Sequence, residues 1–97
     1  MSALGNQFII KIDYDNEWCE YENLMEACRY LNGAALKLYL YLSAYGAGEE
    51  IVFFPSNFHA LTGVSLSAEK KAFAELITNH YLIEKEKNYF LFSSIKK

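Results

Sequence analysis

The chain has 97 residues, a net charge of −3, and a composition of 53% hydrophobic and 16% aromatic residues. This length suits one domain with a single core and is too short for two ordinary domains, and the apolar content excludes a disordered chain. We expect one domain over residues 1–97, with an N-terminal strand and helix over 8–31, a core over 32–92 and a frayed tail over 93–97.

The chain lacks the sequence signals of a membrane or secreted protein. Its longest apolar run, residues 36–45, falls well short of the roughly 20 residues that a membrane span needs. No basic region precedes an apolar segment at the N-terminus, so no signal peptide is indicated. A cytoplasmic protein without membrane contact is therefore predicted, with Cys19 and Cys28 as buried or half-buried free thiols.

The first third of the chain predicts a strand and a helix. Residues 8–14 alternate, with Phe8, Ile10 and Ile12 on one side, which is the period of a half-buried strand. Apolar residues then recur at spacings of three and four and predict an amphipathic helix over residues 20–31. The apolar residues of this pattern are Trp18, Tyr21, Leu24, Met25, Cys28 and Leu31.

Two further helices and a short β-rich run follow. Asn32 and Gly33 break the chain before residues 34–45, which are apolar almost all round and predict a central, mostly buried helix. Residues 51–54 form a β-rich run that ends at Pro55, a residue well suited to the first turn of a helix. We expect that helix over residues 55–62.

The last third predicts a second helix and a hairpin. Gly63 supplies a tight turn, and Ser65 or Ser67 caps a helix whose inward stripe would comprise Ala72, Phe73, Leu76 and Ile77. The same pattern leaves four residues more exposed, namely Glu69, Lys70, Lys71 and Glu75. Residues 81–92 are two apolar runs separated by charged residues, as in a hairpin. With the run at 51–54 this hairpin would form a three-stranded sheet.

Two stretches resemble a known family. They are LNGAALKLYLYLSAY, residues 31–45, and FPSNFHALTGVSLSAEKKAFAELITNHYLI, residues 54–83. Both are similar to the winged helix-turn-helix domains of phage and plasmid replication-initiator-like proteins of Gram-positive bacteria. The matching positions are Leu31, Asn32, Gly33, Lys37, Leu38, Tyr39, Pro55, Gly63, Val64 and Ser65.

This resemblance implies an α+β winged helix-turn-helix fold, with three to four helices, a small antiparallel sheet and a β-hairpin wing. It also implies a phage-type protein of a bacterial host cell that binds double-stranded DNA, as a regulator or replication initiator. Family members that bind DNA usually carry Arg or Lys just after the capping Ser. Here the aligned position is Leu66, with Glu69 in the same helical turn.

The predicted DNA-binding residues lie on the second helix and on the wing. They are Ser65, Ser67, Glu69, Lys70, Lys71, Lys85 and Lys87. The N-terminal end of such a helix commonly contacts phosphates and base edges, and a glutamate can accept from cytosine. On the wing, alternation would place Lys85 and Lys87 on one face and Glu84 and Glu86 on the other. The alternative is that both sets of lysines are ordinary solvated residues.

The charge distribution supports a second hypothesis. Residues 1–32 carry a net charge of −4 and residues 33–97 a net charge of +1. Carboxylates interleaved with aromatic residues in the first third could dock a basic protein surface, as in a phage-encoded inhibitor of the anti-CRISPR kind. A solubilising face with inward aromatics is the alternative. The protein-binding residues of this hypothesis are Asp13, Asp15, Glu17, Trp18, Glu20 and Leu66.

No enzyme, metal or cofactor is predicted. His59 and His80 have no partner at three or four residues that would complete a metal-ligand pair. The chain also lacks a Gly-rich phosphate loop and a nucleophile elbow. Among Tyr39, Tyr41 and Tyr45, at least one is expected at a surface, where a homodimer would use it.

Overall fold

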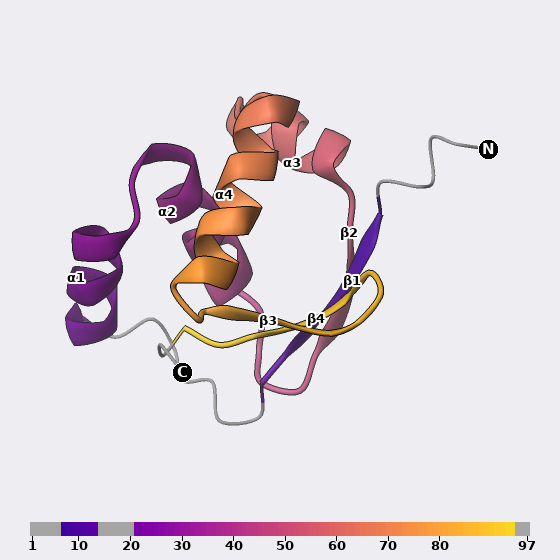
Figure 1. Cartoon of the computed structure of the whole chain (residues 1–97), viewed down its shortest axis with the longest axis horizontal. Helices are drawn as coiled ribbons and strands as arrows, with labels where there is room; N and C mark the ends of the chain where they lie inside the picture. The colour runs from indigo at the N-terminus through magenta and orange to yellow at the C-terminus, as the bar shows by residue number, and fades with distance from the viewer. Residues whose placement is uncertain (1–6, 14–20, 95–97) are drawn as a thin grey trace.

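The computed structural model of the chain describes residues 7–13 and 21–94 and shows an α+β fold (Figure 1). The strands and helices, in chain order, are β1 (Phe8–Ile12), α1 (Tyr21–Tyr30), α2 (Gly33–Ser43), β2 (Glu50–Phe53), α3 (Pro55–Thr62), α4 (Leu66–Thr78), β3 (Leu82–Glu86) and β4 (Tyr89–Phe92). The predicted elements are therefore confirmed in type and order. None of the helices in these two ranges is long and apolar enough to cross a membrane.

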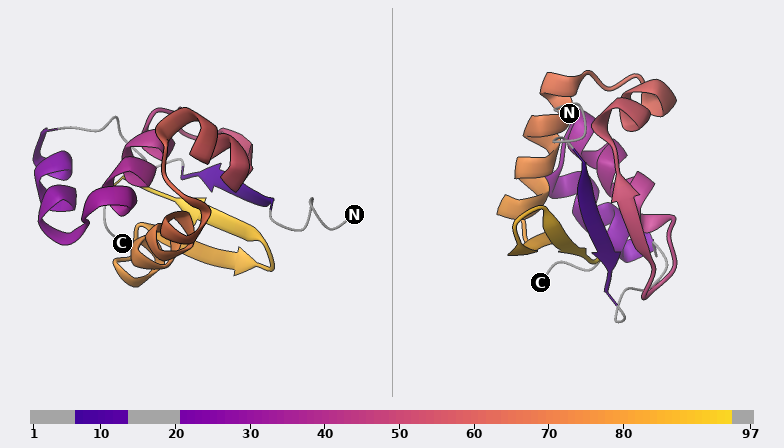
Figure 2. Two further views of the ribbon diagram at one scale, coloured as in Figure 1. Left: turned by 90° about the horizontal axis from the view of Figure 1, so that it is seen from above. Right: turned by 90° about the vertical axis from the view of Figure 1, so that its right-hand side faces the viewer.

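The sheet differs from the small antiparallel sheet that the sequence predicted. It has four strands in the order β2-β1-β4-β3, and β1 pairs antiparallel with β2 but parallel with β4. Strand β1 thus lies between β2 and the β3–β4 hairpin, as Figure 2 shows. The prediction of a purely antiparallel sheet is wrong, because the N-terminal strand joins the sheet and pairs in parallel with β4.

Helices α2 and α4 share a core with one face of this sheet, and α1 packs against α2 (Figure 1). Ile10 and Ile12 of β1 are fully buried, as their alternation predicted, and Ile10 lies opposite Phe90 of β4. Helix α2 packs against α4 and contributes the buried Leu38 and Tyr39. The sheet face, α2 and α4 therefore share one hydrophobic core.

Two parts of the chain are placed differently from their prediction. Ser93 and Ser94, assigned to the frayed tail, are buried, and the Tyr39 hydroxyl donates to the Ser94 carbonyl oxygen at 2.8 Å. Met25 and Cys28, expected on the inward face of α1, are exposed. Cys19 and Trp18 lie outside the described residues.

Helix α4 is rotated relative to its predicted orientation. Glu69, expected to be exposed, is buried, and Ile77, expected to be inward, is 38% exposed. Ala72, Phe73 and Leu76 are buried as predicted. Glu69 is separated from Phe73 by four residues and from Leu76 by seven, which places all three on one helical face. Packing against the sheet and α2 therefore buries the side of α4 that contains the carboxylate.

Candidate interaction surface on helix α4

The turn before α4 fixes the position of this helix. Gly63 ends α3 in a left-handed conformation, with φ of 79°, and its amide donates to the His59 carbonyl oxygen at 2.8 Å. The Nδ1 of His59 lies 2.8 Å from the Val64 carbonyl oxygen. The Ser65 side chain then accepts from the Ala68 amide at 3.2 Å, which caps α4 as predicted. These bonds hold the first turn of α4 at the end of α3.

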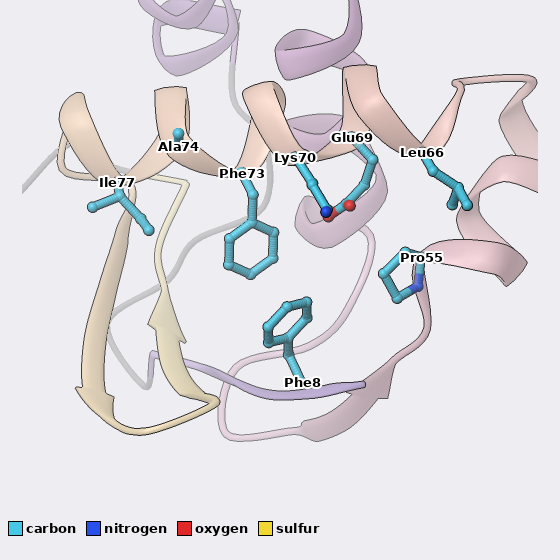
Figure 3. A pocket seen from close by; sticks show the side chains of 8 residues that line it. All are labelled: Phe8, Pro55, Leu66, Glu69, Lys70, Phe73, Ala74 and Ile77. Carbon is cyan, nitrogen blue, oxygen red and sulfur yellow. The ribbon is translucent and has the colours of Figure 1, made fainter. Parts of the chain in front are cut away.

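Four of the predicted DNA-binding residues gather at this end of α4. Ser65, Ser67, Lys70 and Lys71 are exposed. Glu69 does not belong to this exposed surface, because its side chain is only 3% exposed and lines a groove between α4 and β1 (Figure 3). The prediction that Glu69 reads a base is therefore not compatible with its position.

The two wing lysines lie elsewhere. Lys85 and Lys87 are exposed on the β3–β4 hairpin. This hairpin follows the C-terminal end of α4 in the chain (Figure 3). A register shift between Glu84 and Glu86 places Glu84 opposite the buried Phe90 and Glu86 opposite Tyr89. The two carboxylates thus lie on opposite faces, and the expected separation of lysines from glutamates is not kept.

A groove of about 330 Å³ runs along α4, on the side of the helix that faces β1. Figure 3 shows the helix on one side of it and Phe8 of β1 on the other. The residues that line it are Phe8, Pro55, Leu66, Glu69, Lys70, Phe73, Ala74 and Ile77. Apart from Glu69 and Lys70, all of them are apolar.

Aromatic rings form the side of the groove that faces the core. The ring centroids of Phe8 and Phe73 are 4.9 Å apart, and Phe73 lies equally close to Phe90 at 4.9 Å. Leu66 and Ile77, at the two ends of the groove, are 51% and 38% exposed. The groove is therefore an apolar surface that is open to solvent at both ends. Packed aromatic rings form its inner side.

Glu69 is the acidic group of this groove. No hydrogen bond or ion pair of its carboxyl is found within residues 7–13 and 21–94, and its oxygens are not fully enclosed, since the fully buried side-chain atom without a partner in these ranges is the Tyr81 hydroxyl oxygen. Burial raises the pKa of this carboxyl above its ordinary value, and the nearby Lys70 opposes that shift electrostatically. Lys70 itself is exposed at the edge of the groove. A buried carboxyl without a partner is a costly feature for a domain of this size.

The predicted acidic protein-binding surface is described only in part. Asp15, Glu17, Trp18 and Glu20 lie outside the described residues. Asp13 follows the C-terminal end of β1, where its amide donates to the Phe92 carbonyl oxygen at 2.8 Å. Leu66 lies near Phe8, at the opposite end of β1. The structure therefore does not bring Asp13 and Leu66 together.

The other candidates from the sequence are the possible metal ligands and the tyrosines of α2. In the part of the chain that the structure describes, no three His, Cys, Asp or Glu side chains are grouped so as to hold a metal. Tyr39 is buried, and Tyr41 and Tyr45 are half-buried with their hydroxyls 3.4 Å apart. Burial and the contact with Tyr45 raise the pKa of Tyr41 to about 12.

Sequence reasoning missed most of the groove. Leu66, Lys70, Ala74 and Ile77 recur at spacings of four, four and three, which is a second stripe on the same helix that is apolar apart from Lys70. That signal was present in the sequence. The contribution of Phe8 was not, because it depends on the pairing of β1 with β2 and β4.

No family model, curated protein or solved structure matches the chain.

Proposed function

We propose that the chain is a small interaction domain of the winged-helix type that binds a protein partner through the groove along α4. The observation that carries this proposal is the exposure of Leu66 and Ile77 at the ends of an apolar groove. The order α3, Gly63 turn, α4 and β3–β4 hairpin supports the winged-helix assignment. In this assignment β2 is the first strand of the winged helix and the β3–β4 hairpin is its wing. Strand β1 is an additional strand that lies between them.

An apolar groove favours a protein partner over a nucleic acid. Burying apolar surface contributes about 25 cal/mol per Å², and the centres of protein interfaces are rich in aromatic residues and poor in charge. Phe8 and Phe73 supply such a centre. A phosphate backbone offers little apolar surface, and both Glu69 and the net charge of −3 would repel it.

Double-stranded DNA is the second candidate, and one observation favours it. The N-cap Ser65 is exposed together with Ser67, Lys70 and Lys71 on the first two turns of α4. In a helix-turn-helix protein this end of the second helix contacts phosphates and bases. Lys70 belongs to both surfaces, so a protein bound in the groove and a duplex on α4 would compete.

Peptide selection tests the protein-binding proposal. A displayed library of amphipathic helical peptides is selected on the full chain, and affinities are measured for wild type, Leu66→Asp and Ile77→Asp. Each variant should lose at least about tenfold in affinity, or roughly 1.4 kcal/mol. Asp is favourable in the first turn of a helix, so Leu66→Asp should remain folded.

Leu61 provides a matched control, because it is 72% exposed on α3 and does not line the groove. Leu61→Asp should bind the selected peptides like wild type, and an equal loss on this variant would contradict the proposal.

In parallel, a labelled duplex is titrated at low salt against wild type and a Lys70→Glu, Lys71→Glu variant. Duplex binding that depends on both lysines and on salt, with no groove-dependent peptide, would favour DNA.

A further inference from the structure

Glu69 is unnecessary in a purely apolar docking groove. It lines the groove beside Phe73 and Leu66, yet its side chain is only 3% exposed (Figure 3). Within the described ranges its carboxyl has no hydrogen-bond partner and no ion pair, and its oxygens are not fully enclosed but line the groove. A glutamine or leucine would fill the same position without a buried charge. The site therefore contains an acceptor that is free to receive a group from outside the chain.

The chemistry of that group follows from the surroundings of the carboxyl. An apolar environment strengthens an electrostatic interaction, and a carboxylate there binds a cation or a strong hydrogen-bond donor. Lys70 lies at the edge of the groove, and its positive charge favours the ionised form of Glu69 electrostatically without a direct ion pair. An incoming ammonium or guanidinium group would reach Glu69 only if it were attached to an apolar body that fills the rest of the groove.

The shape of the groove favours a helix as that body. Leu66 and Ile77, the first and last lining residues of α4, are eleven residues apart, which at 1.5 Å per residue is about 16 Å, or three helical turns. A convex helix lying along a concave groove can present one residue per turn to it. Two copies of this chain facing each other would instead place one hollow against another and leave an unfilled space.

We infer that the groove binds an amphipathic partner helix in which one Lys or Arg contacts the Glu69 carboxylate and is flanked by apolar residues. Glu69 lies three residues from Leu66 and eight residues from Ile77. The partner helix should therefore carry one apolar residue a turn away from the basic residue on one side and two apolar residues on the other side. This inference rests on the proposed function, because it names the partner of the same groove.

Two peptides that differ at one position test the inference. Both are helical, with a neutral background of Ala and Gln and Leu at the three apolar positions. One carries Lys at the basic position, and the other carries norleucine, which has the same chain without the ammonium group. Fluorescence anisotropy with the full wild-type chain should show at least about tenfold tighter binding of the Lys peptide.

Two protein variants assign that preference to Glu69. Glu69→Gln should bind the two peptides with equal affinity. Glu75→Gln, which changes a carboxylate on the same helix outside the groove, should keep the full preference of wild type. Thermal unfolding monitored by circular dichroism establishes that both variants are folded. The comparison of the two peptides on wild type does not depend on any variant.

The possible failures are distinguishable. Equal binding of both peptides to wild type would overturn the inference and leave the protein-binding proposal standing. Retention of the Lys preference in Glu69→Gln would also overturn it, since another group would then hold the cation. If neither peptide binds and selection yields no groove-dependent helix, the proposed function fails as well. Binding of n-hexylammonium alone, abolished in Glu69→Gln, would assign the groove to a small cation instead.

Discussion

At the scale of single residues, Glu69 links the stability of the domain to its surface chemistry. The carboxyl is buried and unpartnered in the described structure, and its pKa is raised by desolvation. A carboxyl whose folded pKa lies above its unfolded value binds protons more readily in the folded state. Its favourable contribution is present at low pH and is lost as the pH rises through the folded pKa. The domain therefore keeps at neutral pH a group that destabilises it.

We predict that Glu69→Gln raises the melting temperature at pH 7 and that the gain shrinks as the pH is lowered. Glutamine keeps an unpaired polar group at this position, so the gain is only the part of the cost that belongs to the charge; about 1 kcal/mol corresponds to about 4–8 °C for a domain of this size. At low pH the protonated glutamate resembles glutamine, so the two proteins should melt together. Calorimetry across this pH range measures the effect. Lys70 is the charged neighbour in the described structure, and Lys70→Met should raise the pKa of Glu69 further.

Glu75→Gln is the control for this measurement, because Glu75 lies outside the groove on the same helix. Its melting temperature should follow that of wild type across the pH range. A gain for Glu69→Gln that is independent of pH would contradict the assignment of the effect to the charge of this carboxyl.

At the scale of elements, local signals in the sequence predicted the α3–α4 unit well. Pro55 at the start of α3, the left-handed Gly63 and the capping Ser65 all act through the backbone of their own turn. The orientation of α4 was less predictable. Glu69 and Ile77 both border the apolar face, and tertiary packing, which no local pattern contains, decides which of them is buried.

We predict that Gly63→Ala destabilises the domain by about 1 kcal/mol or more, since alanine is strained where φ is positive. No heavy atom outside the immediate chain lies within 4 Å of an added Cβ at this glycine, so the cost comes from the backbone alone. Gly63→Asn should cost less, because asparagine tolerates the left-handed region. Urea unfolding of the two variants gives the comparison. Equal costs would show that the left-handed conformation is not what limits this position.

At the scale of the whole molecule, β1 determines both the sheet and the groove. The alternation of residues 8–14 predicted a strand but did not indicate which strands would pair with it. A period of two is the same whichever strands are the neighbours and whether they run parallel or antiparallel. In the structure β1 joins β2 to the hairpin and carries Phe8 to the face of α4. The groove could therefore be predicted only on its helical side. Without β1, the sheet would separate into a single strand and a two-stranded hairpin.

We predict that the loss of one inward side chain of β1 destabilises the whole domain. Ile10 is fully buried between the register partners Ile51 and Phe90, and Ile10→Ala should cost about 2–5 kcal/mol. Ile9 lies on the opposite, partly exposed face of the same strand, so Ile9→Ala is the matched control and should cost less. Urea unfolding compares the two variants.

Because β1 is paired on both edges, its amides should exchange with solvent only through global unfolding, as slowly as those of β4. Faster exchange of β1 in an otherwise folded domain would show that the strand is peripheral, and the groove would then lose the wall that Phe8 provides.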